Sequence, residues 1–174
     1  MDIRKLSRIQ DSLSRIQCSR YSDLDDKIIS KASSLGLPLI GGTALEILAD
    51  YYSVDGVRKR SNNDLDFLSK DNKNKLYFMS WIQENIDPDK VEVDFYDEAP
   101  KQYKNYILDI DGILVMNPVY LIWSKLIRAS KKDLTDIKWL LSIPQLTDEE
   151  LSEGMDDLGL KKSEIALLDR KSVV

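Results

Sequence analysis

Residues 39–48 read LIGGTALEIL and residues 60–68 read RSNNDLDFL, and these two stretches carry the clearest structural signals in the chain. The apolar start of the first stretch predicts a short strand, its end predicts a helix, and Gly41-Gly42-Thr43 predicts a turn between them. Glycine lets a ligand approach the backbone closely, and the start of a helix attracts negative charge. The turn is therefore a candidate phosphate site, with the Thr43 hydroxyl as a further donor. A tight turn without a ligand is the simpler explanation for the two glycines alone.

The second stretch ends in an alternation of polar and apolar residues over 64–68, which predicts a strand with one wet face. Asp64 and Asp66 are two positions apart, so their side chains point to the same face of that strand. Two carboxylates this close repel each other unless a cation lies between them, and carboxylate oxygens suit Mg²⁺. Asp-x-Asp is also common in surface loops, which is the alternative for this pair.

A second alternating segment, residues 91–95, places Glu92 and Asp94 together on the face opposite its apolar residues. If this strand neighbours the first, Asp94 completes a cluster of three carboxylates with Asp64 and Asp66. Three carboxylates that hold two Mg²⁺ ions, with Mn²⁺ as an alternative, form the arrangement for in-line displacement at phosphorus. A solvated strand face is the alternative explanation for the second pair.

The rest of the chain predicts helices before and after these strands, so the fold class is α/β (α+β) with a mixed sheet. An Asp111-Gly112 pair predicts a hairpin turn, and Thr147 predicts the capping box of a C-terminal helix. The expected elements are helices at 2–17, 22–34, 44–52, 72–85 (buried stripe Leu76, Met79, Ile82), 117–142 (bent near Ser130), 147 onward and 163–170, and strands at 37–40, 64–68, 91–95, 106–110 and 113–116.

Together, the two opening stretches resemble the signature of the DNA polymerase beta-like nucleotidyltransferases, most closely the small AbiEii/AbiGii toxin-like members. The later sequence KLIRASKKDLTDIKWLL, residues 125–141, is similar to their downstream motif. The resemblance implies a sheet of about five strands with flanking helices: a core at 1–116 and a helical C-terminal region at 117–174 packed on it. It also implies roles for residues of this chain: Asp64, Asp66 and Asp94 as catalytic metal ligands, and Gly41, Gly42, Thr43, Arg60, Lys125 and Asp133 as nucleotide contacts.

The downstream motif also has a spacing of its own. On one continuous helix Lys125, Arg128, Lys132 and Asp136 would share one face. The other face would hold the apolar residues Leu126, Ile127, Leu134, Ile137, Leu140 and Leu141. The charged face is a candidate phosphate-binding surface. A solvated charged face, stabilised by pairs such as Lys132 with Asp136, is the alternative.

Composition excludes several kinds of chemistry. The 174 residues contain no histidine and one cysteine, Cys18, so a Ser-His-Asp triad, a Cys-His dyad and a Cys-based zinc site are excluded. The net charge of −5 disfavours general nucleic-acid binding, but residues 118–140 hold five basic residues against two acidic ones. No long apolar run and no apolar leader segment are present, so we expect a cytoplasmic protein without a membrane partner.

A competing motif lies at 106–115, which reads YILDIDGILV. It resembles the first motif of haloacid-dehalogenase-type phosphatases, with Asp109 as the nucleophile. That fold needs further parallel strands after the motif, whereas the remaining residues predict helices. We therefore interpret the segment as a hairpin.

The expected function is a metal-dependent nucleotidyltransferase that moves a nucleoside monophosphate from an NTP to an acceptor. The resemblance implies an RNA (tRNA among them) or a protein as the acceptor, in a toxin–antitoxin or defence setting with a cognate antitoxin. The short chain and the compressed downstream motif support an alternative, in which a nucleotide-binding or protein-interaction module on the same fold has lost turnover.

Overall fold

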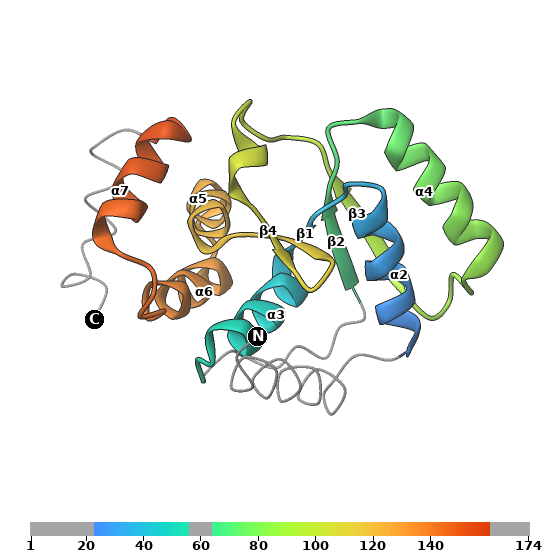
Figure 1. Cartoon of the computed structure of the whole chain (residues 1–174), viewed down its shortest axis with the longest axis horizontal. Coiled ribbons are helices and arrows are strands. Elements are labelled where there is room, and N and C mark those ends of the chain that lie inside the picture. Colours follow the sequence, from blue (N-terminus) through green and yellow to red (C-terminus); the bar gives the residue numbers. More distant parts are fainter. Residues whose placement is uncertain (1–22, 56–63, 161–174) are drawn as a thin grey trace, which may run out of the picture.

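The computed structural model describes residues 23–55 and 64–160. The described chain forms five strands, six α-helices and one short 3₁₀ helix (Figure 1). Their bounds are α2 Asp23–Ser34, β1 Leu39–Ile40, α3 Gly41–Tyr52, β2 Asp64–Leu68, α4 Asn72–Asn85, β3 Glu92–Tyr96, η1 Tyr103–Tyr106, β4 Ile107–Ile110, β5 Ile113–Met116, α5 Pro118–Arg128, α6 Lys131–Leu141 and α7 Asp148–Asp157.

The strands form a single sheet in the order β3-β2-β1-β5-β4. Strand β1 runs antiparallel to β2 and parallel to β5, β2 runs parallel to β3, and β4 and β5 are antiparallel. This arrangement confirms a mixed sheet of five strands with flanking helices, as expected for an α+β fold. The division at residues 116 and 117 stays a prediction, although α5 does begin directly after this point, at Pro118.

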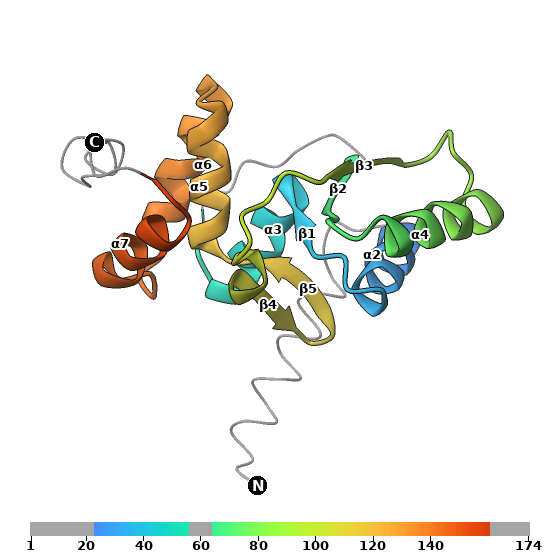
Figure 2. The same ribbon diagram turned by 90° about the horizontal axis from the view of Figure 1, so that it is seen from above.

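The helices form two groups on either side of the sheet. Both views place α2 and α4 together beyond β2 and β3, and α5, α6 and α7 together at the other end of the molecule, with α3 between the groups (Figures 1 and 2). The short strand β1 contributes Leu39, which is fully buried at the centre of the sheet.

Phe78 is the one fully buried residue of helix α4 and makes its main contact with the sheet. Phe78 is fully buried and makes edge contacts with Phe67 of β2 at 5.5 Å and Phe95 of β3 at 5.9 Å between ring centroids. The predicted stripe is wrong at two of its positions, because Leu76 is 65% exposed and Met79 is 38% exposed. The third position, Ile82, is partly buried and packs against the core, so the helix is oriented by Phe78 and Ile82 rather than by Leu76 and Met79.

The hairpin prediction is confirmed. Asp111 and Gly112 both adopt left-handed backbone conformations, with φ of 52° and 86°, between β4 and β5. This pair of conformations is the one that a two-residue hairpin turn requires. The Asp109 carboxylate is exposed and accepts a hydrogen bond of 2.8 Å from the Gly112 amide. Asp109 thus stabilises the turn, and the antiparallel β4–β5 pairing differs from the parallel strands of the phosphatase reading.

The helical region after the hairpin is two helices rather than one continuous helix. Helix α5 ends at Ala129, which is left-handed with φ of 49°. Ser130 then caps α6, because its hydroxyl accepts from the Asp133 amide while the Asp133 side chain accepts from Ser130, a reciprocal capping box. The predicted apolar face is wrong at two positions, since Ile127 is 61% exposed and Leu134 is 48% exposed, but it is confirmed at Ile137, Leu140 and Leu141, which are buried. The break folds α6 back against α5.

Helix α7 closes the described chain. Thr147 and Glu150 form the predicted capping box at its start. Gly154 lies against Val119 of α5 so closely that a Cβ atom would overlap the valine side chain. A glycine inside this helix therefore serves close packing of α7 on α5.

Some predictions lie outside the described residues: the helices at 2–17 and 163–170, Cys18 and Arg60. Among the residues that are described, no helix combines the length and the apolar character needed to cross a membrane.

Candidate functional site

The two acidic strands are neighbours. In the parallel pairing of β2 with β3, Asp66 is opposite Asp94 and Asp64 is opposite Glu92. Residues paired in this way, and residues two apart on one strand, point to the same face of a sheet. All four acids therefore belong to one face, while Leu65 of β2 points to the core.

The glycine turn lies directly beside these acids. Ile40, the last residue of β1, pairs with Asp66, and the following Gly41 approaches the Asp66 carboxylate so closely that a Cβ atom would overlap it. The Thr43 hydroxyl donates to the Asp64 carbonyl oxygen at 3.4 Å. Helix α3 starts at Gly41, earlier than predicted, so both glycines are in its first turn. The fold thus places the N-terminus of α3 beside Asp64 and Asp66.

We expect Gly41→Ala to lower the free energy of unfolding by more than the cost of a positive φ at alanine. Gly41 has a φ of +70°, and alanine in this region costs about 1–2 kcal/mol. Overlap with the Asp66 side chain adds about 1–3 kcal/mol. Gly36 provides a matched control, because its φ is +72° but nothing lies within 4 Å of the added Cβ. Urea unfolding of both variants measures the difference; equal losses would contradict the close approach of Asp66.

A pocket of about 590 Å³ opens between this turn and helix α5. Gly41 and Asp66 form part of one wall, and the α5 residues Ser124, Lys125 and Arg128 form part of another. The lining also includes a second acid, Glu98, and three aromatic residues, namely Tyr96, Tyr120 and Trp123. The pocket therefore combines an acidic wall, a basic wall and aromatic surface, which suits a ligand with both phosphates and a planar ring.

Tyr96 is a pocket residue that the sequence analysis missed. It follows Asp94 by two positions on β3, so it shares the acidic face, and its side chain is 40% exposed. Partial burial and the charges of Asp66 and Asp94 raise the pKa of the Tyr96 hydroxyl above its ordinary value, and only Arg128 opposes them. Tyr96 therefore enters the pocket as a neutral hydroxyl close to charges of both signs. The period-two pattern of its strand was the signal that could have found it.

Lys125 and Asp133 lie together in a buried ion cluster. The Lys125 ammonium donates to Asp136 at 2.7 Å and lies 3.6 Å from Asp133, and its side chain is 2% exposed. Arg128 donates to the same Asp133 at 2.7 Å, but its side chain is 55% exposed. The cluster joins α5 to α6 with two cations and two carboxylates.

Asp133 is the centre of this cluster. Burial alone would raise the pKa of its carboxyl, but hydrogen bonds from Ser130 and Arg128 and the charges of Arg128 and Lys125 outweigh burial, so the pKa is below its ordinary value. Both carboxylate oxygens are engaged, one by Arg128 at 2.7 Å and the other by the Ser130 hydroxyl at 2.6 Å. Because it is ionised and hydrogen-bonded at both oxygens, the Asp133 carboxylate holds the Arg128 and Ser130 side chains in fixed orientations.

The structure brings some of the predicted site residues together. Gly41, Asp66 and Lys125 line one pocket. The other described candidates lie around it without forming its lining: Gly42, Thr43, Asp64, Asp94 and Asp133. Asp94 is exposed on β3.

The chemistry of the acidic face suits a hard cation, because its donors are carboxylate oxygens. Asp64 and Asp66 on β2 and Asp94 on β3 are the residues that would hold Mg²⁺ there. Within the part of the chain that the structure describes, no three acidic side chains are gathered closely enough to enclose an ion. Asp64, Asp66 and Asp94 thus offer carboxylate oxygens on one face of the sheet, which are the kind of ligand that Mg²⁺ prefers.

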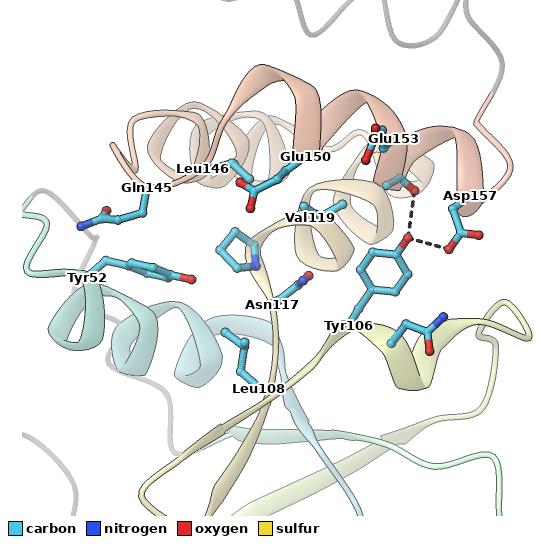
Figure 3. Close-up of a pocket in the computed structure, with 13 residues that line it drawn as sticks. Tyr52, Tyr106, Leu108, Asn117, Val119, Gln145, Leu146, Glu150, Glu153 and Asp157 are labelled. Atoms are coloured by element: carbon cyan, nitrogen blue, oxygen red, sulfur yellow. Dashed lines mark hydrogen bonds between the residues drawn. The ribbon is translucent and has the colours of Figure 1, made fainter.

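A second pocket, of about 500 Å³, lies between α7, α5 and the end of α3 (Figure 3). All its charged lining residues are acids of α7, namely Glu150, Glu153 and Asp157. Tyr106 donates from its hydroxyl to Asp157 at 2.6 Å (Figure 3), and burial together with this carboxylate raises the pKa of Tyr106 to about 12. Three carboxylates disfavour a phosphate ligand, so the first pocket is the candidate nucleotide site.

The chain was compared with models of protein families, with curated proteins and with solved structures. None of the three comparisons finds a match.

Proposed function

We propose that this protein is a metal-dependent nucleotidyltransferase. The observation that carries the proposal is the contact between Gly41 and the Asp66 carboxylate at the wall of a pocket whose opposite wall is basic. A glycine bend at a helix start suits a phosphate chain, and carboxylates beside it suit the cations that accompany such a chain. The chain's resemblance to small nucleotidyltransferases supports the same pairing of motifs.

In the proposed reaction an acceptor hydroxyl attacks the α-phosphorus of an NTP. The new O–P bond forms as the bond to pyrophosphate breaks, and the hydroxyl proton passes to a carboxylate of the acidic face. The turn at Gly41 holds the phosphates, the basic wall binds their negative charge, and the aromatic residues Tyr96 and Trp123 offer surface to the base. Bound Mg²⁺ supplies charge neutralisation at the phosphates.

The acceptor that we propose is an RNA end, with tRNA as one candidate, or a protein hydroxyl. These acceptors come from the family resemblance, as do the toxin–antitoxin setting and the cognate antitoxin. The proposed cytoplasmic location comes instead from the lack of a long apolar run in the sequence. The pocket itself favours the NTP, because one small-molecule-sized cavity combines both charges and aromatic surface.

One observation favours the alternative of a nucleotide-binding or protein-interaction module without turnover. The Lys125 ammonium, a nucleotide contact by resemblance, is 2% exposed and bound to Asp136. A cation that is already neutralised contributes little to a transition state.

Incubation of the purified protein with labelled NTPs, Mg²⁺ and total RNA separates these functions. Transfer of label to RNA, or to protein, supports the enzyme. Mg²⁺-dependent NTP binding without transfer supports the module. Hydrolysis of a phosphate ester that depends on Asp109 would contradict both and restore the phosphatase interpretation.

A further inference from the structure

We propose that Arg128, rather than Lys125, is the residue of the basic wall that binds the phosphate chain of the nucleotide, and that Asp133 is the residue that positions it. This inference rests on the proposed function for the identity of the ligand. It replaces two of the nucleotide contacts that the sequence resemblance implies, Lys125 and Asp133.

The first argument is exposure. Both cations line the pocket, but the Lys125 side chain is 2% exposed and that of Arg128 is 55% exposed. A phosphate that reached the Lys125 ammonium would have to displace Asp136 at 2.7 Å and would enter a region that already holds a second carboxylate. Arg128 is also paired, with Asp133 at 2.7 Å, but its exposed guanidinium can meet a ligand at the pocket surface without giving up that bond.

The second argument is donor geometry. The bond from Arg128 to Asp133 uses one nitrogen, Nη2. A guanidinium group carries five N–H donors in a rigid plane, so one bond to Asp133 fixes the plane and leaves further donors directed elsewhere. Arginine held in this way matches the paired oxygens of a phosphate group.

The third argument is how Asp133 is held. Its second oxygen accepts from the Ser130 hydroxyl at 2.6 Å and from the Ser130 amide at 3.3 Å, within the capping box of α6. The carboxylate is therefore fixed by the turn that ends α5, and Arg128 is the last residue of that helix. Arg128 lines the same pocket as Asp66 and Tyr96, and its charge offsets part of the rise in the pKa of the Tyr96 hydroxyl, so the guanidinium faces the acidic wall.

Isothermal titration calorimetry with MgATP, and separately with inorganic tripolyphosphate, tests the proposal. We expect Arg128→Gln to weaken binding of both ligands about 10-fold or more, and Arg128→Lys to weaken it less, because a charge-assisted hydrogen bond contributes about 1.5–3 kcal/mol. Lys138→Gln is the matched control. Lys138 is an exposed cation of α6 that does not line the pocket, so we expect its loss to change affinity less than about 2-fold.

A double-mutant cycle tests the positioning role of Asp133. We expect Asp133→Asn, which keeps an acceptor for the guanidinium, to weaken MgATP binding in the wild-type background but to add little in the Arg128→Gln background. A general structural role would give additive losses instead. Thermal unfolding of each variant verifies that the fold is kept, and Arg128→Gln removes an exposed side chain that the core does not need.

The outcomes separate this inference from the proposed function. Unchanged affinity of Arg128→Gln for both ligands overturns the inference while leaving transfer activity intact as evidence for the enzyme. Absence of binding by the wild-type protein also overturns it. Arg128-dependent binding without any transfer confirms the inference and favours the module over the enzyme.

Discussion

Asp66→Asn is expected to abolish nucleotidyl transfer, with a loss of more than about 100-fold in rate. Asparagine has almost the same shape as aspartate but lacks its charge, so the wall beside Gly41 would no longer attract a cation. Loss of an anionic ligand at a site of this kind removes several kcal/mol of stabilisation from the transition state, and each 1.4 kcal/mol is about 10-fold in rate. The assay with labelled NTP and RNA measures the effect.

The control for this variant is Asp109→Asn. Asp109 is likewise an aspartate on a strand of the same sheet, but it is exposed and belongs to the hairpin turn and not to the pocket. We expect its transfer rate to stay within about 2-fold of the wild type, since surface substitutions away from a site have small effects. Retention of full transfer by Asp66→Asn would refute the assignment of the acidic face.

Lys125→Met is expected to destabilise the fold by about 3–5 kcal/mol. Methionine keeps the length of the side chain but removes the ammonium that Asp136 binds at 2.7 Å in a nearly water-free setting. Removal of one partner from a buried ion pair is costly because the other charge stays buried. The free energy of unfolding from urea denaturation gives the size of the loss.

Two comparisons show whether burial is the cause. Lys90 and Asp87 form an exposed pair at 3.7 Å, with side chains 66% and 48% exposed, and Lys90→Met should change stability by no more than about 0.5 kcal/mol. Adding Asp136→Leu to Lys125→Met should recover part of the loss, because the uncompensated carboxylate is then gone. A loss at Lys125 as small as that at Lys90 would show that the cluster contributes little.

The local elements were predictable where one short-range rule dominates. Alternation of polar and apolar residues placed Asp64 and Asp66 on one face of a strand, and the Asp111-Gly112 pair defined the hairpin. Thr147 and Glu150 defined the start of α7 in the same way. In each case the rule involves residues within a few positions of each other, and the tertiary contacts of these segments agree with it.

The predictions were wrong where contacts between residues far apart in the sequence determine the local structure. Helix α4 is turned by Phe78, whose partners Phe67 and Phe95 come from two other elements. The break after α5 needs Ala129 in a left-handed conformation that alanine disfavours by itself, so the packing of α6 on α5 stabilises it. The pattern of Ser130 and Asp133 was a capping-box signal that the sequence analysis did not use.

The sequence alone was sufficient for the strands, the Asp111-Gly112 hairpin and the common face of Asp64 and Asp66, because backbone preference and side-chain period are local properties. It was not sufficient for Gly41-Gly42-Thr43, which is the first turn of α3 rather than a separate turn. Only the tertiary structure decided that Gly41 contacts Asp66 and that Arg128, not Lys125, is the exposed cation of the pocket. The first depends on the antiparallel pairing of β1 with β2. The second depends on α6 folding back, which brings Asp136 to the Lys125 ammonium and buries both charges.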